Sequence, residues 1–235
     1  MKSEVFNEDC MVGMARYPDK YFDLAIVDPE FGIGIANSPR LVLDKGKQGK
    51  DWDNKPIGME YFTELFRVSK NQIIWGGNYY PLPANKHCIV WDKKQPEGMS
   101  FGMFDYAWTS FDGANKMFRS SVQDEKDKIH PTQKPIRLYR WLLDRYAYCK
   151  TCKNEGSFYE DVAGDGGSKM LIDCENCDVA TDGVPKILDT HLGSGSSRIA
   201  AYDLGYNFTG FELDKDYFEA AEKRYQNHIK QLNLF

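Results

Sequence analysis

The stretch KILDTHLGSGSSRIAAYDLGYNFTGFELD, from Lys186 to Asp214, decides the fold that we expect of this chain. An apolar run, KILDT, is followed by a turn of small residues, GSGS, and by a helical segment that begins near Ser194 or Ser196 and stops at Gly205. A second apolar run, NFTGFEL, comes next. This order predicts two parallel strands joined by a helix. The free N–H groups of the helix N-terminus and the small turn residues favour a nucleoside ligand.

The rest of the chain continues this alternation of strands and helices. We expect a buried strand at FDLAIVD, further short strands at NQIIWGG and HCIVWDK, and a half-exposed strand at FDYAWTSF. Helices are expected over residues 57–69 and 135–148, and a C-terminal helix capped by Asp214 follows. The sequence therefore predicts one α/β domain over residues 1–235, with a mainly parallel sheet.

Composition narrows the class of protein. The 235 residues carry a formal net charge of -5, which does not indicate a strong generic nucleic-acid binder, so any DNA contact must come from a local basic patch. No apolar run reaches the roughly 18 residues that a membrane helix needs. The N-terminal MKSEVFNEDC has acidic residues where a signal peptide would be apolar. We therefore expect a cytoplasmic protein with no membrane partner.

The residues around the Gly-rich turn favour S-adenosylmethionine as the cofactor. Glu212 lies 17 residues after Gly195, at the end of the next strand, where a carboxylate can accept hydrogen bonds from both ribose hydroxyls. Asp189 would repel a pyrophosphate but could hold a cationic amino group. The turn also lacks the lysine of a P-loop and the full spacing of a dinucleotide site. A purely structural turn followed by a chance glutamate is the alternative.

A second motif, Asp28-Pro29-Glu30-Phe31, follows the predicted strand FDLAIVD. The exocyclic amine of a nucleobase is a poor nucleophile because its lone pair is delocalised into the ring. The Asp28 carboxylate and the Pro29 carbonyl are placed to accept its two hydrogens, which would make the nitrogen more nucleophilic. Phe31 offers a face on which an extruded base can stack, worth about 1–3 kcal/mol.

With these motifs the chain resembles the amino-methylating DNA methyltransferases of the permuted beta group. That family has a (D/N/S)-P-P-(Y/F/W) motif first, then a target-recognition segment, an H-P-T-Q-K-P box and a D-x-x-x-G-S-G cofactor motif. The matches are DPEF at Asp28, HPTQKP at His130 and DTHLGSGSS at Asp189. The resemblance covers nearly the whole chain and implies a Rossmann-like S-adenosylmethionine-dependent methyltransferase fold with circularly permuted motif order.

The resemblance also implies residue roles. Thr132 and Lys134 would lie near the methionine end of the cofactor, Asp9 and Cys10 near its adenine ring, and Glu212 at the ribose. The residues expected at the cofactor are Asp9, Cys10, His130, Thr132, Lys134, Asp189, His191, Gly193, Ser194, Gly195 and Glu212. Those expected at the chemistry are Asp28, Pro29, Glu30 and Phe31.

The function implied is methylation of the exocyclic amine of adenine in double-stranded DNA, as in restriction–modification. Aspartate at position 28 favours adenine; cytosine, an RNA base, or a catalytically weak nucleic-acid-binding relative are the alternatives. Residues 93–128, with interleaved aromatic and basic side chains, are the expected target-recognition segment. For its aromatics, a strand and loop that complete the core are an equal alternative. A segment this short would recognise few bases by itself. Recognition of a longer DNA sequence would need a homodimer or an accessory recognition subunit.

Two positions depart from the family pattern. Glu30 stands where the family usually has proline. The glutamate adds a charge and a backbone N–H that proline lacks, which suggests reduced or altered activity. Thr190-His191 stands where Pro-Phe is commoner. We expect His191 to be a wall of the cofactor pocket rather than a proton shuttle.

A cysteine-bearing insertion separates the HPTQKP helix from the cofactor strand, over residues 149–178. Cys149 and Cys152 form one C-x-x-C pair, and Cys174 and Cys177 form another, with 21 residues between the pairs. In a chain without a secretion signal, two such pairs predict a structural zinc site rather than disulfides. The segment would extend the DNA-binding face or make a dimer contact, and the sequence does not choose between these.

Overall fold

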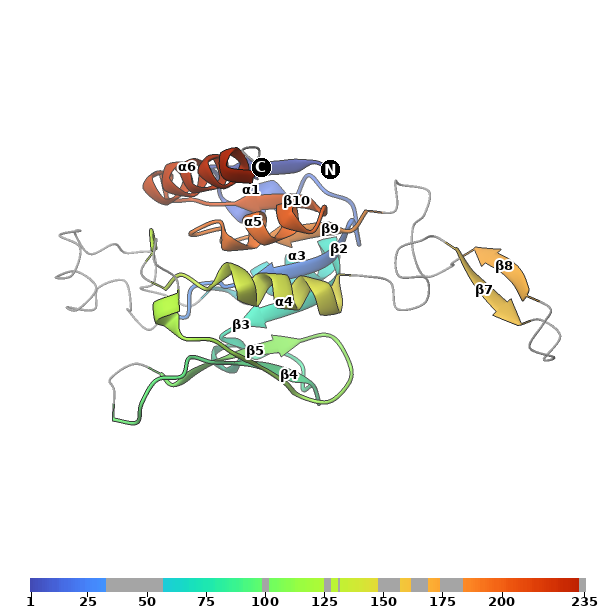
Figure 1. Cartoon of the computed structure of the whole chain (residues 1–235), viewed down its shortest axis with the longest axis horizontal. Helices are drawn as coiled ribbons and strands as arrows, with labels where there is room; N and C mark the ends of the chain where they lie inside the picture. The colour runs from blue at the N-terminus through green and yellow to red at the C-terminus, as the bar shows by residue number, and fades with distance from the viewer. Residues whose placement is uncertain are drawn as a thin grey trace.

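An eight-stranded sheet forms the centre of the molecule, here described from a computed structural model (Figure 1). The structure describes residues 1–32, 57–98, 102–124, 128–130, 132–147, 157–161, 169–173 and 184–232. The strand order is β1-β10-β9-β2-β3-β5-β4-β6. The strands are β1 Ser3–Phe6, β2 Phe22–Val27, β3 Ser69–Trp75, β4 Cys88–Asp92, β5 Phe104–Thr109, β6 Lys116–Arg119, β9 Lys186–Asp189 and β10 Asn207–Phe211.

The pairing is mainly parallel, as predicted. β1, β10, β9, β2 and β3 all run in the same direction, and β4 pairs with β6 in parallel. β5 is antiparallel to both of its neighbours, β3 and β4. Because β2 and β9 are adjacent, the loops that leave their carboxyl ends meet at the same edge of the sheet.

Helices cover both faces of the sheet (Figure 1). They are α1 Cys10–Met14, α3 Met59–Val68, α4 Ile136–Tyr146, α5 Ser196–Asp203 and α6 Lys215–Leu232, with short 3-10 turns η2 Gly77–Tyr79 and η3 Val122–Asp124. In one core cluster, residues of α4, α5 and α6 pack on the sheet, and in a second cluster residues of α1 and α3 do.

The sequence of β2 explains why helices pack on both faces of the sheet. Leu24 and Ile26 belong to the cluster under α4 and α5, whereas Ala25 and Val27 belong to the cluster under α1 and α3. Alternate residues of a strand point to opposite faces, so a continuous apolar run must be buried on both sides. The strand therefore lies at the centre of the molecule.

Among the strands of the main sheet and the α-helices that cover it, three are not foreseen from the sequence: β1, α1 and β6. β1 lies at the edge of the sheet and is only half-buried, so its residues show no continuous apolar run. α1 has five residues, too few for a helical period to be visible. β6 is the opposite edge strand, with mostly exposed residues. In each case tertiary pairing or packing outweighs a weak local signal.

The predicted recognition segment, residues 93–128, contributes β5 and β6 to the main sheet. Trp108 is buried in the core, whereas Phe104 is 58% exposed. The aromatics of this segment thus divide between completing the core and facing outward. Its assignment to target recognition stays a prediction.

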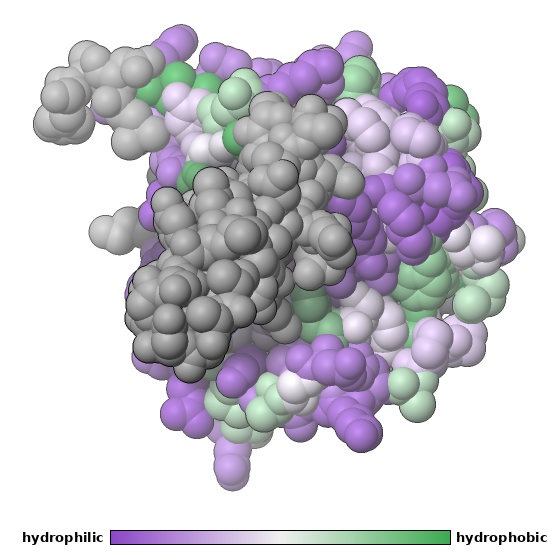
Figure 2. Space-filling view, turned by 90° about the vertical axis from the view of Figure 1, so that its right-hand side faces the viewer, coloured by the Kyte–Doolittle hydropathy of each residue, from purple (hydrophilic) through white to green (hydrophobic). Residues whose placement is uncertain are grey.

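The four cysteines of the predicted zinc site lie outside the described residues. Between them the structure describes a two-stranded antiparallel sheet, β7 Ser157–Asp161 and β8 Lys169–Asp173. On either side of this region, α4 ends and β9 begins at the side of the main sheet opposite the carboxyl ends of β2 and β9 (Figure 1). The described residues on this face are mainly hydrophilic, with scattered apolar ones (Figure 2). No helix in the described part of the chain is long and apolar enough to cross a membrane.

Truncating the centre of β2 tests the fold. Leu24 is fully buried, and we expect Leu24→Ala to lower the free energy of unfolding by about 2–5 kcal/mol because it removes apolar contacts and leaves a cavity. Urea denaturation measures the loss. Leu213→Ala is the matched control, since Leu213 is 72% exposed and its truncation should cost under about 0.5 kcal/mol. Equal losses in the two variants would contradict the placement of β2.

Candidate functional site

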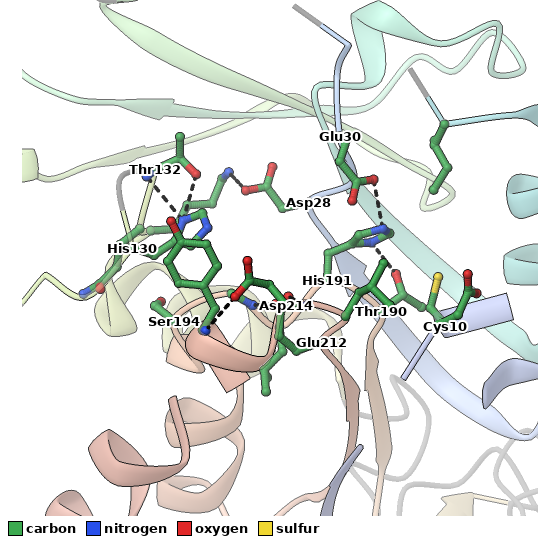
Figure 3. Close-up of a pocket in the computed structure, with 18 of the residues that line it drawn as sticks. Cys10, Asp28, Glu30, His130, Thr132, Thr190, His191, Ser194, Glu212 and Asp214 are labelled. Atoms are coloured by element: carbon green, nitrogen blue, oxygen red, sulfur yellow. Dashed lines mark hydrogen bonds and ion pairs between the residues drawn. The ribbon is translucent and has the colours of Figure 1, made fainter. Parts of the chain in front are cut away.

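A cavity of about 430 Å³ opens at the carboxyl ends of β2, β9 and β10, within the size range of small-molecule sites. Its walls come from the loops after these strands, from α1 and α6, and from the segment that leads into α4 (Figure 3). The lining residues are Glu8, Asp9, Cys10, Met11, Asp28, Glu30, Ile57, His130, Thr132, Gln133, Lys134, Tyr139, Thr190, His191, Leu192, Gly193, Ser194, Glu212, Leu213, Asp214 and Tyr217.

The Gly-rich turn forms the floor between β9 and α5. Gly193 and Gly195 have φ angles of 52° and 71°, in the left-handed region that glycine adopts without strain. Gly195 is the residue that precedes α5, and it does not line the cavity, whereas Gly193 and Ser194 do. An alanine at Gly195 would bring its Cβ within 3.3 Å of Ala221, so glycine also permits α6 to approach the turn.

Glu212 joins two loops at the cavity wall. Its Oε2 accepts a hydrogen bond from the Gly193 N–H at 2.7 Å, and its Oε1 accepts one from the Asp214 N–H at 2.9 Å. Burial raises the pKa of Glu212 above its usual value, against the lowering effect of these two N–H groups. Each oxygen keeps a second lone pair, so the carboxylate can still accept hydrogen bonds from a ligand's hydroxyls.

Asp189 does not lie in the cavity wall, contrary to the expectation that it would hold a cofactor ammonium. It is 2% exposed. Its Oδ2 accepts a hydrogen bond from the Ser197 hydroxyl at 2.5 Å, and its Oδ1 accepts one from the His191 N–H at 3.1 Å. Asp189 therefore shapes the turn from beneath. Burial raises its pKa to about 6.

Asp28 lies at the end of β2 and pairs with Lys134. Lys134 Nζ donates to Asp28 Oδ2, and the lysine side chain is only 4% exposed. The same Nζ lies 5.1 Å from the centre of the Trp75 ring, a cation–π distance. The other oxygen, Asp28 Oδ1, is buried and has no hydrogen-bond partner among the described residues. A buried acceptor without a donor is costly, so this oxygen is a candidate for ligand contact.

Two residues of the DPEF motif, Pro29 and Phe31, do not line the cavity. The Pro29 and Glu30 carbonyl oxygens both lie 3.0 Å from the Tyr80 hydroxyl, which donates to them. Phe31 stacks on Tyr79 at a centroid distance of 4.9 Å. The motif's backbone and aromatic ring are thus held in place by neighbours.

Glu30 lines the cavity and faces His191. Glu30 Oε2 lies 3.2 Å from His191 Nε2, and the side chains are 29% and 16% exposed. His191 Nδ1 lies 2.9 Å from the Thr190 hydroxyl, which in turn lies 2.5 Å from the Tyr61 hydroxyl. These contacts link the loop after β2 to the loop after β9 and to α3 (Figure 3).

The two members of this pair shift each other's pKa. Burial works to raise the pKa of Glu30, but the facing imidazole outweighs it and holds the pKa below its usual value. Burial works to lower the pKa of His191, but the Glu30 carboxylate outweighs it and raises the pKa. Both shifts favour the charged pair.

The HPTQKP box supplies another wall. His130, Thr132 and Lys134 line the cavity, as does Gln133. The Thr132 hydroxyl lies 3.2 Å from His130 Nδ1, and the His130 ring packs edge-on against Tyr217 of α6 at 4.3 Å. The box thus lies between Asp28, directly after β2, and helix α6, which follows β10.

The N-terminal segment closes the site on the side of α1. Asp9 caps α1, its Oδ1 accepting from the Met11 N–H at 2.7 Å. Cys10 is the first residue of the helix, and both residues line the cavity. Burial, with Asp9 and Glu30 nearby, raises the pKa of the Cys10 thiol to about 12, so this cysteine is a neutral wall residue at about pH 7.

Several lining residues are missed from the sequence: Glu8, Met11, Ile57, Gln133, Tyr139, Thr190, Leu192, Leu213, Asp214 and Tyr217. Most are direct sequence neighbours of predicted site residues, so extending each predicted site by one residue on either side would have found them. Tyr139 and Tyr217 belong to the apolar faces of α4 and α6, where nothing distinguishes them from core residues. Within the described ranges, no group of three or more His, Cys, Asp or Glu side chains could hold a metal ion.

No protein-family model matches this chain. Among solved structures, the M1.HpyAVI–SAM complex is 17% identical with a TM-score of 0.53, covering 95% of this chain and 100% of that one. TTHA0409 from Thermus thermophilus, a candidate DNA modification methylase complexed with S-adenosyl-L-methionine, is 15% identical with a TM-score of 0.51, covering 96% of this chain and 94% of that one. PvuII DNA methyltransferase (cytosine-N4-specific) is 10% identical with a TM-score of 0.54, covering 98% of this chain and 92% of that one.

These similarities extend over nearly the whole length of both chains in each comparison. At such low identity they establish the fold alone. The chain thus has the α/β fold, with a mixed and mostly parallel sheet, of these DNA methyltransferase structures.

The buried Asp189 makes a specific prediction for stability against pH. A carboxyl whose pKa is raised to about 6 on folding stabilises the folded state most at low pH, and this contribution is lost as pH rises. Asp189→Asn removes the titration. We expect the wild type to lose up to about 3 kcal/mol relative to the variant between about pH 4 and pH 7. Urea denaturation at several pH values measures it, and parallel curves for the two proteins would contradict it.

Proposed function

We propose that this chain is an S-adenosylmethionine-dependent DNA methyltransferase that methylates the exocyclic amine of adenine. The observation that carries the proposal is Asp28, which lines a cavity that Glu212 also lines and whose buried Oδ1 has no hydrogen-bond partner within the described part of the chain. Asp28 can accept a hydrogen bond from an amine, and Glu212 can accept hydrogen bonds from a ribose. Asp28 follows β2 and Glu212 follows β10, two strands that run in the same direction in the sheet. The motif order, the same as that of the permuted beta group, supports this assignment.

The charge of the cavity supports a cationic cofactor. Its acidic lining residues are Glu8, Asp9, Asp28, Glu30, Glu212 and Asp214, whereas Lys134 is the only lysine or arginine among the described lining residues. Lys134 is already paired with Asp28. A phosphate-bearing ligand would meet uncompensated negative charge, while a sulfonium and an ammonium would be attracted. S-adenosylmethionine carries both cations, one carboxylate, a ribose and no phosphate.

The residues present fit each part of this cofactor. Glu212 would accept from the ribose hydroxyls, Asp9 and Cys10 would lie near the adenine, and the HPTQKP residues Thr132 and Lys134 near the methionine end. When bound, the cofactor supplies a methyl group on a sulfonium, which leaves as a neutral thioether. Positioning can supply much of the remaining rate.

Asp28 would then act on the target amine. Its Oδ1 would accept a hydrogen bond from one amine N–H, which moves electron density toward the nitrogen lone pair. As the nitrogen bonds to the methyl carbon and the C–S bond breaks, the amine would lose its extra proton to water. Lys134 holds Oδ2 and so keeps the carboxylate oriented. The Pro29 carbonyl is hydrogen-bonded by Tyr80 but keeps a second lone pair for the other amine hydrogen. The Phe31–Tyr79 stack, with Tyr79 48% exposed, would support an extruded base from outside the cavity.

Cytosine is the second candidate base, because one of the similar structures is a cytosine-N4-specific methyltransferase. The arrangement around Asp28 suits any exocyclic amine, so it does not separate the two bases. A catalytically weak nucleic-acid-binding relative is the alternative from a different class, motivated by Glu30. Double-stranded DNA is the proposed partner, with residues 93–128 as the recognition segment, alone or with a second subunit.

Zinc is a separate part of the proposal. It rests on the two C-x-x-C pairs, Cys149 with Cys152 and Cys174 with Cys177, since the structure does not describe these residues. The flanking elements α4 and β9 end and begin, respectively, at the side of the sheet away from the cavity. This attachment point favours a dimer or subunit contact over a role in holding the target base.

Asp28→Asn tests the proposed chemistry. The variant keeps the size of the side chain but replaces the carboxylate, and we expect methyl transfer to mixed-sequence DNA to fall by at least about a hundredfold, as when a transition-state hydrogen-bond partner is lost. Labelled methyl transfer followed by base analysis measures the rate and identifies the base. Calorimetry should show that the cofactor still binds.

The matched control is Asp23→Asn, because Asp23 also pairs with a lysine, Lys70, at 3.0 Å but lies outside the cavity. Its transfer rate should stay near that of the wild type. Methylation found on cytosine instead of adenine would select the second candidate. Cofactor binding without any methylation would favour the weak nucleic-acid-binding relative.

Metal analysis tests the zinc proposal. We expect about one zinc per wild-type chain and a clear loss in Cys174→Ser, because a four-cysteine site depends on every ligand. The measurement is the zinc content of the purified proteins. Under about half an equivalent in the wild type would sink the proposal.

A further inference from the structure

The two positions at which this chain departs from the family motifs meet in space. Glu30, in the loop after β2, stands where the family that this chain resembles usually has proline, and His191, in the loop after β9, stands where phenylalanine is commoner. Their side chains lie 3.2 Å apart as an ion pair. In the sequence they look like two independent changes, of which only Glu30 suggests reduced or altered activity. In the structure they are partners (Figure 3).

Each change alone would be costly. A glutamate 29% exposed facing an apolar ring would lose hydration without gaining a partner, and a histidine 16% exposed facing proline would do the same. Together they satisfy each other, because removal of one partner of this half-buried ion pair leaves a charge that is only partly hydrated and has no partner. The pairing therefore explains why both departures occur in one chain.

The surroundings favour the charged form of the imidazole. The carboxyl groups that act on His191 are Glu30 after β2, Asp189 at the end of β9 and Glu212 after β10. Thr190 and Tyr61 contact its ring. Asp28, Cys10 and Lys134 line the same cavity, and the cation Lys134 is paired with Asp28. Burial raises the pKa of Tyr61 and of Cys10, so both remain neutral.

The pair also reaches beyond the cavity wall. His191 Nδ1 contacts the Thr190 hydroxyl at 2.9 Å, and that hydroxyl contacts Tyr61 of α3 at 2.5 Å. The His191 N–H donates to Asp189. These groups thus hold the imidazole on the loop after β9, called here the cofactor loop. Glu30 lies two residues after Asp28 in the loop after β2, called here the amine-holding loop, and its carboxylate attaches that loop to the imidazole.

We infer that Glu30 and His191 act as one positioning unit, in which the ion pair anchors the amine-holding loop to the cofactor loop and so sets the place of the Asp28 carboxylate. This inference rests on the proposed function. Glu30 is then not a disabling substitution, and Glu30→Pro alone should reduce activity by removing the partner of His191.

The pair predicts a pH dependence with a definite sign. Both groups are charged only above the lowered pKa of Glu30 and below the raised pKa of His191. A histidine whose pKa is raised by its partner loses that interaction as pH rises through the raised value. The rate of methyl transfer should therefore fall as pH rises beyond the usual histidine range of about 6.5, once the imidazole is neutral.

The first experiment tests the pair without any need for catalysis. The ring signals of His191 are titrated by NMR in the full-length wild type and in Glu30→Gln. We expect the pKa of His191 to be lower in the variant, because the carboxylate is gone while the side-chain size is kept. An unchanged pKa would overturn the inference, whether or not the chain methylates DNA.

The second experiment tests positioning through a double-mutant cycle on single-turnover methyl transfer. Glu30→Pro and His191→Phe should each slow transfer by about tenfold or more, as expected when reacting groups are displaced, while cofactor affinity measured by calorimetry changes less. The double variant, which restores the family's apolar pair, should recover to within about threefold of the wild type. Additive losses would overturn the inference.

The control is a second half-buried histidine–carboxylate pair, which lies outside the cavity. His228 of α6 lies 2.6 Å from Asp203 of α5, with side chains 20% and 11% exposed. His228→Phe should lower stability but leave the transfer rate and its pH profile unchanged. If the wild type binds the cofactor yet transfers no methyl group to any DNA, the proposed function fails, and the NMR titration still decides whether the pair exists.

Discussion

The parallel pairing of β2 with β9 is the constraint on which the rest of the site depends. Leu24 lies opposite Ile187 and Ala25 opposite Leu188, although the two strands come from opposite ends of the chain. Because parallel strands end at the same edge, the DPEF loop and the Gly-rich turn are brought together. The HPTQKP segment leads into α4 beside them, and Lys134 reaches Asp28.

Electrostatic balance decides what this edge can hold. The cavity gathers six acidic side chains, and the cations that offset them, Lys134 and the imidazole of His191, are both engaged with carboxylates. Pairing leaves one Asp28 oxygen without a described partner and one Glu212 carboxylate with spare lone pairs. A cavity of this kind attracts a cationic ligand with hydroxyl groups and offers an unpaired acceptor for an amine.

Long apolar runs and turn residues made much of the fold predictable. The buried strands, α3, α4, the stop at Gly205 and the Asp214 cap of α6 occur where the pattern indicates, within a few residues. Edge strands and short helices were not predictable, because β1 and β6 owe their form to a neighbour rather than to their own residues. The same holds for Tyr139 and Tyr217, which become site residues only through the packing of two helices.

By itself, the sequence determined the order of the motifs and which residue types could meet a nucleoside and an amine, because these depend on local spacing along the chain. Only the tertiary structure decided how those residues are used. It places Asp189 beneath the turn and packs Phe31 on Tyr79. It also joins Glu30 to His191 in one ion pair, although the two residues are far apart in the sequence. The physical reason is that charge compensation and burial depend on distance in space, which a linear pattern does not contain.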